Sequence, residues 1–260
     1  MELPNELIVV IAEYLPLADI KSLSLCSWAL YNLLSPLIYR TIKCNWDQLP
    51  EFGTLPLSQY THRLQLTSTG EWRYSPFLRS EWKFLTHLHL TCATSSSAWI
   101  KYTCSEPMRI VNLELNCVVK DKPSYFDFEH TAKMVHLSHI SLRNFNLIMT
   151  DKFHPSLKSV DLTDCSWFYP HDIAQIGDIE TLKIALKRVS DPFSLSERLQ
   201  FASSNIPSGL LELHICLDSN HRVKWKPLRN GSKSLRKLVL VGFEQHKYTN
   251  LPNIVSIQQD

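Results

Sequence analysis

The stretch Leu85-Thr86-His87-Leu88-His89-Leu90 decides the fold, because its apolar residues follow the pattern L-x-x-L-x-L. The same spacing returns in Ile110-Val111-Asn112-Leu113-Glu114-Leu115 and in Leu157-Lys158-Ser159-Val160-Asp161-Leu162. The pattern is typical of repeats in which each copy supplies one short strand. Because side chains of a strand alternate between two faces, the last two apolar residues of each copy share one face and the polar residues share the other. Each copy therefore predicts a strand with one apolar face.

Copies of this pattern recur along most of the chain. Their central apolar residues are Leu64, Leu88, Leu113, Ile140, Val160, Leu182, Leu213 and Leu238. The steps between them are 24, 25, 27, 20, 22, 31 and 25 residues. Most steps lie within the span of about 20–29 residues that leucine-rich repeats use. A further, irregular copy is expected at Leu251, with Ile254 as its central residue. The spacing predicts an α/β solenoid of about eight or nine repeats.

Two features modify the repeat. The longest step contains Ser194 and Glu197, spaced as a capping box, which predicts a helix on the convex side of the solenoid. Repeats of this kind also place Asn or Cys at their ninth position, where the side chain turns inward. Cys165 fits that position, whereas Val118 and Phe145 occupy it in other copies. We therefore expect a ladder of inward Asn side chains to be mostly missing.

The first part of the chain carries a helical pattern instead. Leu7, Val10 and Ile11 are three and four residues apart, which places them on one face of a helix. Pro4 suits the first turn of this helix and Pro16 ends it. Apolar residues at helical spacing between positions 17 and 38 predict two more short helices. Helices this small present more apolar surface than they bury among themselves. The excess either packs against the rest of the chain or awaits a partner helix.

This helical segment resembles an F-box, and its last residues resemble those of fungal members in particular. The resemblance covers residues 2–42. The matching positions are Leu3, Pro4, Glu6, Leu7, Ile11, Tyr14, Leu15, Pro16, Leu17, Asp19, Ile20, Leu23, Leu25 and Cys26, followed by residues 33–40. Leu30 stands where the family often has Trp, and Trp28 lies two residues earlier. Together with the repeats, the chain resembles the F-box/leucine-rich-repeat proteins, a substrate-receptor family of SCF ubiquitin ligases.

The resemblance implies three regions and a way of acting. The expected regions are an F-box at residues 1–42, a linker into the solenoid at 43–60 and a leucine-rich-repeat domain at 61–260. The F-box would bind a Skp-type adaptor and, through it, a cullin, while the repeats hold an unidentified target protein. The adaptor-binding residues so implied are Leu3, Pro4, Leu7, Ile11, Leu15, Pro16, Leu17, Ile20, Leu23, Leu25 and Leu30. The alternative is a non-degradative structural subunit of an F-box/adaptor complex, for example in a centromere or trafficking assembly.

Polar side chains between the apolar positions of the repeats are the expected target-binding surface. They should face the concave side of the solenoid, because they alternate with the core residues. The candidates are Arg63, His87, His89, Glu114, His139, Arg143, Asp161, Lys183, Glu212, His214 and Lys237. A surface with both signs of charge suits protein recognition by local charge matching. Nucleic acid is therefore not expected as the main ligand.

A basic run follows near the C-terminal end. Between Ser219 and Phe243 the chain has seven Lys and Arg residues and no Asp or Glu. Such a run either meets an acidic or phosphorylated partner or nucleic acid, or forms a solvated convex loop. Only Lys237 falls at a concave position, which favours the loop.

No pattern of an enzyme or of a cofactor site stands out. The chain has 27 Lys and Arg against 25 Asp and Glu, only 6 Gly, and no phosphate-loop, dinucleotide-binding, HExxH or nucleophile-elbow motif. His87 and His89 share a strand face, and His139 and His214 occupy equivalent positions in other repeats. We interpret these histidines as recognition residues rather than as zinc ligands, which must converge tetrahedrally on one point. The expectation is a binding protein without intrinsic catalysis, metal or cofactor.

Several general features bear on location. The sequence contains no apolar run of about 18 residues, so no membrane-spanning helix is expected. Its first residues lack the pattern of a secretory signal peptide. Seven scattered Cys residues without a C-x-x-C pair favour reduced thiols. We therefore expect the protein in the cytoplasm, the nucleus or both.

Overall fold

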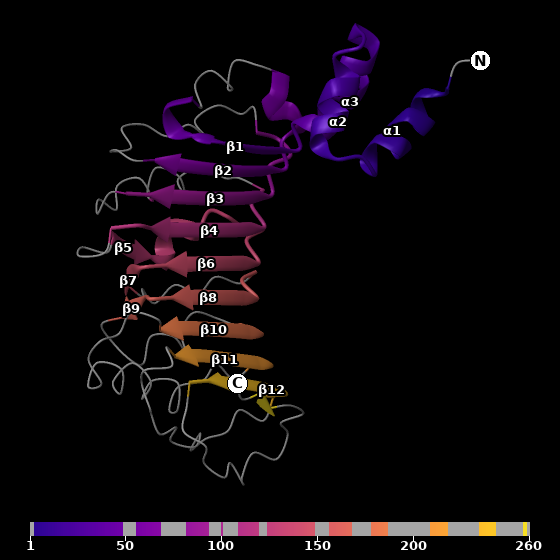
Figure 1. Ribbon diagram of the computed structural model, residues 1–260. Helices are drawn as coiled ribbons and strands as arrows, with labels where there is room; N and C mark the ends of the chain where they lie inside the picture. Colours follow the sequence, from indigo (N-terminus) through magenta and orange to yellow (C-terminus); the bar gives the residue numbers. More distant parts are fainter. Residues whose placement is uncertain are drawn as a thin grey trace.

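The computed structural model consists of three helices followed by a stack of parallel strands (Figure 1). It describes residues 3–48, 56–68, 82–93, 100, 109–119, 124–148, 156–167, 178–186, 209–217, 234–242 and 257–258. The helices lie at one end of the stack, where the first strands begin, and the last strands lie at the opposite end. The expected architecture, three short helices followed by a solenoid of parallel strands, is confirmed.

The three helices are α1 (Asn5–Glu13), α2 (Leu17–Ser24) and α3 (Trp28–Ile38). Pro4 and Pro16 directly precede α1 and α2, and their carbonyl oxygens accept the first helical hydrogen bonds. At α3 the hydroxyl oxygen of Ser27 accepts a hydrogen bond from the N–H of Leu30 over 3.2 Å, which caps the helix. The helices pack around a small core of their own, made of Ala12, Ile20, Leu34 and Ile38.

All strands of the large sheet run parallel, and the sheet follows the chain from one end of the stack to the other. Its strands, in spatial order, are β1 (Thr41–Asn45), β2 (Arg63–Ser68), β3 (His87–Cys92), β4 (Asn112–Cys117), β6 (His139–Arg143), β8 (Ser159–Thr163), β10 (Thr181–Leu186), β11 (Glu212–Leu217), β12 (Lys237–Val241) and β13 (Ile257–Gln258). The strands β2 to β12 of this sheet lie where the repeated pattern predicts them.

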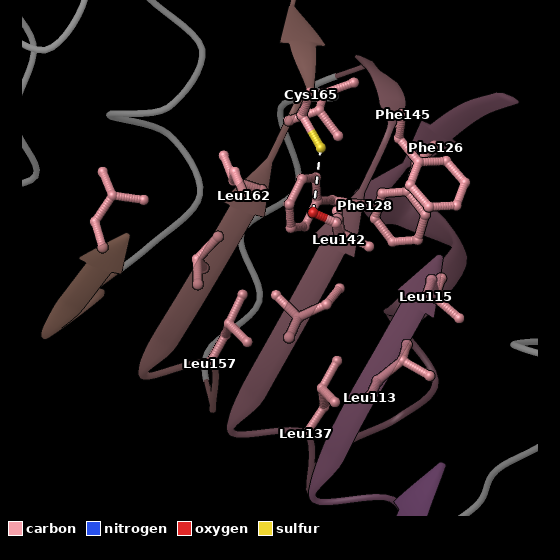
Figure 2. Packing of buried hydrophobic residues seen from close by; sticks show 14 of the residues in the cluster. Leu113, Leu115, Phe126, Phe128, Leu137, Leu142, Phe145, Leu157, Leu162 and Cys165 are labelled. Carbon is pink, nitrogen blue, oxygen red and sulfur yellow. Dashed lines mark hydrogen bonds between the residues drawn. The ribbon is translucent and has the colours of Figure 1, made fainter. Parts of the chain in front are cut away.

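The register of the sheet places equivalent repeat residues side by side. Leu64 is paired with Leu88, Leu88 with Leu113, and Leu113 with Ile140. All four side chains are at most 2% exposed. Figure 2 shows this core from close by, with leucines of successive strands pointing to the same side of the sheet. The apolar columns therefore form one continuous core under the strands.

Each repeat enters its strand through the same turn. The carbonyl oxygen of His62 accepts hydrogen bonds from the N–H groups of both Thr86 and His87, each 3.0 Å long. The carbonyl oxygen of Arg40, which follows α3, accepts the same pair of bonds from His62 and Arg63. The repeat geometry thus begins directly at the end of the last helix. Strand β1 accordingly occupies the start of the interval 43–60 that we expected as a linker, and short 3-10 turns follow at η1 (Trp46–Gln48) and η2 (Pro56–Tyr60).

A second, small sheet lies beside the carboxyl ends of β4, β6 and β8 (Figure 1). Its parallel strands are β5 (Ser124–Asp127), β7 (Phe145–Ile148) and β9 (Ser166–Trp167), and a 3-10 turn, η3 (Phe128–Thr131), follows β5. The ring of Phe126 packs edge-on against Phe128 and Phe145, with centroid distances of 5.1 and 6.0 Å. These aromatic rings close the core at this end of the strands (Figure 2).

Left-handed residues turn the chain from the large sheet into the small one. Asn144 and Asp164 follow β6 and β8 with φ angles of 61° and 51°. The side-chain amide of Asn144 donates hydrogen bonds to the carbonyl oxygens of Cys117, over 2.9 Å, and Val119, over 2.5 Å. At the ninth position Cys165 is fully buried and its thiol donates to the carbonyl oxygen of Leu142 over 3.3 Å (Figure 2). The repeat of β6 thus has an inward Asn at Asn144, one position before Phe145, which occupies the ninth position there.

The end of the solenoid differs from our expectation. The central residue of the last copy was predicted to be Ile254, but Ile257 is the residue paired with Leu238 of β12. The pattern at Leu251 misled the prediction because Pro and Asn interrupt the alternation that fixes register elsewhere. The capping box at Ser194 and Glu197, and most of the basic run after Ser219, lie outside the described residues.

Candidate interaction surfaces

The helical segment exposes many large apolar side chains. Nine large hydrophobic side chains before β1 are between 36% and 86% exposed. They are Leu3, Leu7, Val10, Ile11, Tyr14, Leu15, Leu17, Leu25 and Trp28, and we call them the helical apolar surface. Many exposed apolar side chains within one small unit are typical of surfaces that bind another protein.

This surface exists because α1 is apolar on two sides. Ile8 and Ala12, four residues apart, face the core of the helical unit. Leu7 and Ile11 occupy the neighbouring side at the same spacing and are each 49% exposed. The sequence left two alternatives for this apolar excess, packing against the rest of the chain or binding a partner helix. In the structure, the described chain leaves Leu7 and Ile11 half exposed, which favours the partner.

The expected adaptor-binding residues divide into two groups. Leu3, Pro4, Leu7, Ile11, Leu15, Pro16, Leu17 and Leu25 are exposed. By contrast, Leu23 and Leu30 are half-buried, and Ile20 lies in the core of the helical unit with 6% exposure. The sequence reasoning did not assign Val10, Tyr14 or Trp28 to this surface. Tyr14 and Trp28 are 86% and 75% exposed. Tyr14 directly follows α1 and Trp28 begins α3, and this position at helix ends was the available signal.

A second surface is formed by the side chains that alternate with the core residues of the large sheet. We call it the open face. All eleven expected target-binding residues are on it, and each is exposed or half-buried. Arg63, His87, His139, Glu212 and Lys237 belong to its first row, at the start of the strands. His89, Glu114, Asp161, Lys183 and His214 belong to the middle row, and Arg143 to the third row.

Histidines of the open face are held by their neighbours. Nδ1 of His89 lies 2.7 Å from Oε2 of Glu114, and its Nε2 lies 3.1 Å from the hydroxyl of Thr91. The side-chain amide of Asn112 donates to Nε2 of His87 over 2.7 Å, so the proton of this ring resides on Nδ1. Hydrogen bonds to neighbouring side chains therefore fix the orientation of both imidazole rings.

Carboxylates of the open face lie in two different environments. Burial raises the pKa of Asp161, and the positive charges of Lys183 and Arg143 only partly oppose this. The hydrogen bond from His214 lowers the pKa of Glu212, and Lys237 contributes in the same direction. Glu212 is thus satisfied within the chain: its Oε2 lies 3.1 Å from Nε2 of His214 and 3.5 Å from Nζ of Lys237.

Within the described ranges, no group of three or more His, Cys, Asp or Glu side chains is arranged to hold a metal ion. His87 and His139 are separated by Asn112 in the first row of the open face. In the same part of the chain, no helix has the length and apolar character needed to cross a membrane. The six cysteines that the structure describes are free thiols.

Comparison with known proteins bears on the helical unit. Residues 1–39 match the family model of the F-box domain. No curated protein sequence matches the chain. Among solved structures, the chain is similar to an internalin from Listeria monocytogenes, with 13% sequence identity and a TM-score of 0.41, over 80% of this chain and 69% of that chain.

The chain thus carries a match to the F-box domain at residues 1–39, followed by a solenoid of parallel strands whose copies follow the pattern L-x-x-L-x-L. F-box domains generally bind Skp-type adaptors. The two exposed surfaces, one apolar and one polar, fit an architecture that joins two partners.

Proposed function

We propose that the protein is the substrate-recognition subunit of an SCF-type ubiquitin ligase, acting in the cytoplasm or nucleus. The helical apolar surface would bind a Skp-type adaptor, which in turn binds a cullin. The open face would hold a target protein. The observation that carries the proposal is the helical apolar surface within the F-box match, because its half-exposed leucines and isoleucine have no cover in the described chain.

The chain would contribute position rather than bond chemistry. Holding a target beside a ubiquitin-charged enzyme raises the effective concentration of the target's lysines there. The F-box and the solenoid are joined without an intervening flexible segment, since the repeat turn begins at Arg40. This joint favours a fixed orientation of the target relative to the adaptor.

Truncation of the helical apolar surface tests the adaptor interface. Leu7→Ala with Ile11→Ala should weaken adaptor binding at least tenfold. Covering the exposed half of each side chain is worth about 1 kcal/mol, and about 1.4 kcal/mol corresponds to a tenfold change. Isothermal titration calorimetry of the full chain with a Skp-type adaptor measures the effect.

Val135→Ala provides the matched control for this truncation. Val135 is an apolar side chain outside the F-box and is 65% exposed. Its truncation should leave the affinity unchanged. Equal affinities of the wild type and the double variant would exclude the proposed interface. A target that accumulates in cells when the protein is removed would support the degradative role.

A further inference from the structure

Charge is distributed unevenly along the open face. From β4 to β12 its side chains include three acids and three Lys or Arg residues. The acids are Glu114, Asp161 and Glu212, and the cations are Arg143, Lys183 and Lys237. Strands β1, β2 and β3 carry Lys43 and Arg63 and no Asp or Glu. The unbalanced positive charge of the open face therefore lies on its first three strands, beside the F-box.

The two cations are neighbours on the sheet. Arg63 is paired with Thr41 of β1 and with His87 of β3, while Lys43 is paired with Gln65. Adjacent strands lie about 4.8 Å apart and alternate residues of one strand about 6.7 Å apart, so the Cα atoms of Lys43 and Arg63 are about 8 Å apart. Both side chains are exposed and long enough to reach one anionic group between them. Arg adds a planar, two-pronged donor that matches carboxylate and phosphate oxygens.

Neither side chain forms an ion pair within the part of the chain that the structure describes. Glu114, the open-face acid nearest along the sheet, is on β4 and lies 2.7 Å from the ring of His89. At the other end of the open face, by contrast, Glu212 lies against both His214 and Lys237. The described residues of the first three strands thus carry cations without an acid, while the later strands carry as many acids as cations.

The surroundings of Arg63 support this reading. Burial lowers the pKa of His87, and the positive charge of Arg63 lowers it further, as expected of two groups on one face. The proton of the neutral ring lies on Nδ1, 2.9 Å from the hydroxyl of Thr86. His87 is therefore an oriented, uncharged polar group, and the positive charge of the first three strands comes from Lys43 and Arg63.

We propose that Lys43 and Arg63, with Gln65 and the strand hydroxyls around them, bind an anionic segment of the partner protein. The segment carries either clustered Asp and Glu or phosphorylated residues, which share the negative oxygens that these donors recognise. This inference rests on the proposed function, since it names the part of the target that the solenoid holds. It places that segment at the end of the solenoid next to the F-box.

The test uses the full chain in complex with a Skp-type adaptor and three labelled peptides of equal length. One alternates Glu and Gly, one alternates phosphoserine and Gly, and one alternates Ser and Gly. Fluorescence anisotropy at moderate salt should show binding of at least one anionic peptide and none of the Ser peptide. Lys43→Glu with Arg63→Glu should weaken that binding by roughly tenfold or more, because two attractions become repulsions.

Lys133→Glu is the matched control, since Lys133 is an exposed cation that follows η3 and lies outside the open face. It should change the affinity less than about twofold. The neutral pair Lys43→Gln with Arg63→Gln should give an intermediate loss. The peptide that binds more tightly identifies the source of the anion. Adaptor affinity is measured on the same samples and should be unchanged. A loss of adaptor binding can thus be distinguished from a loss of peptide binding.

Three results would overturn the proposal. The first is equal peptide affinity of the wild type and the Lys43/Arg63 charge reversal. The second is no binding of either anionic peptide by the adaptor complex. The third is a labelled single-stranded oligonucleotide that binds more tightly than both peptides and loses its affinity in the same variant, which would assign these cations to nucleic acid.

Discussion

Asn144 has a backbone conformation that few residues tolerate, and the two hydrogen bonds of its side chain are made from that conformation. Its φ of 61° is left-handed, and its amide donates to the carbonyl oxygens of Cys117, the last residue of β4, and of Val119. Asn144→Ala would strain the backbone and remove both donations. We expect it to lower the free energy of unfolding by about 2–4 kcal/mol in urea denaturation.

Asn144→Gly separates the two contributions. Glycine adopts the left-handed conformation without strain but donates nothing from a side chain. Its loss of stability should therefore fall between the wild type and Asn144→Ala. A glycine variant as stable as the wild type would show that the two hydrogen bonds of Asn144 contribute nothing.

The raised pKa of Asp161 predicts that the stability of the fold depends on pH. Its pKa in the folded protein is raised above the ordinary value of 3.8, chiefly by burial. The folded state therefore holds the proton more tightly than the unfolded chain, so this carboxyl stabilises the fold below the unfolded pKa. That contribution is lost as pH rises through the folded pKa. Asp161→Asn escapes the loss and should gain stability relative to the wild type as the pH rises above the ordinary pKa of 3.8.

Urea denaturation of the wild type and of Asp161→Asn at several pH values checks this expectation. The difference in unfolding free energy should grow in favour of the variant as the pH rises. Lys183→Gln serves as the second arm, because it removes a cation that opposes the raised pKa of Asp161. With Asp161 retained, Lys183→Gln should therefore make the unfolding free energy fall more steeply as the pH rises. A difference that does not change with pH would contradict the argument.

At the scale of elements, the strands β2 to β12 of the large sheet could be predicted and those of the small sheet could not. In β3 and β4 the alternation of buried and exposed side chains determines both the strand and its register. No such signal marks β9, which consists of Ser166–Trp167 alone. It forms because the chain turns at Asp164 and lies beside β7, and that depends on a neighbouring repeat.

The same distinction applies to the two candidate surfaces. On the open face, alternation alone decided which residues point outward, so its members were predictable from sequence. In the helical unit, apolar positions occur on more than one side of each helix. Ile20 of α2 is buried while Leu17 of the same helix is 48% exposed. Packing of α2 against α3 decides between them, and the spacing of residues within one helix does not contain that information.

At the scale of the whole molecule, the F-box and the solenoid share a residue. The side chain of Tyr39 packs against both the core of the helical unit and the core of the solenoid. Its hydroxyl lies 3.5 Å from that of Tyr31 in α3, and its backbone carbonyl accepts a hydrogen bond from the hydroxyl of Thr61 over 3.1 Å. With the repeat turn at Arg40, these contacts couple the helices to β1 and β2.

Tyr39→Ala should uncouple the two parts. In the wild type, amides of α3 and β2 are expected to exchange with solvent through one common opening, because neither core can open at Tyr39 without the other. Removing this half-buried ring should lower the opening free energy of α3 by about 2 kcal/mol and leave the last strands of the solenoid unchanged. Native-state hydrogen exchange of the full chain measures both.

Tyr39→Phe keeps the ring and should retain the coupling. Separate openings of α3 and β2 in the wild type would mean that the joint is flexible and that the F-box does not fix the direction in which the solenoid presents its target.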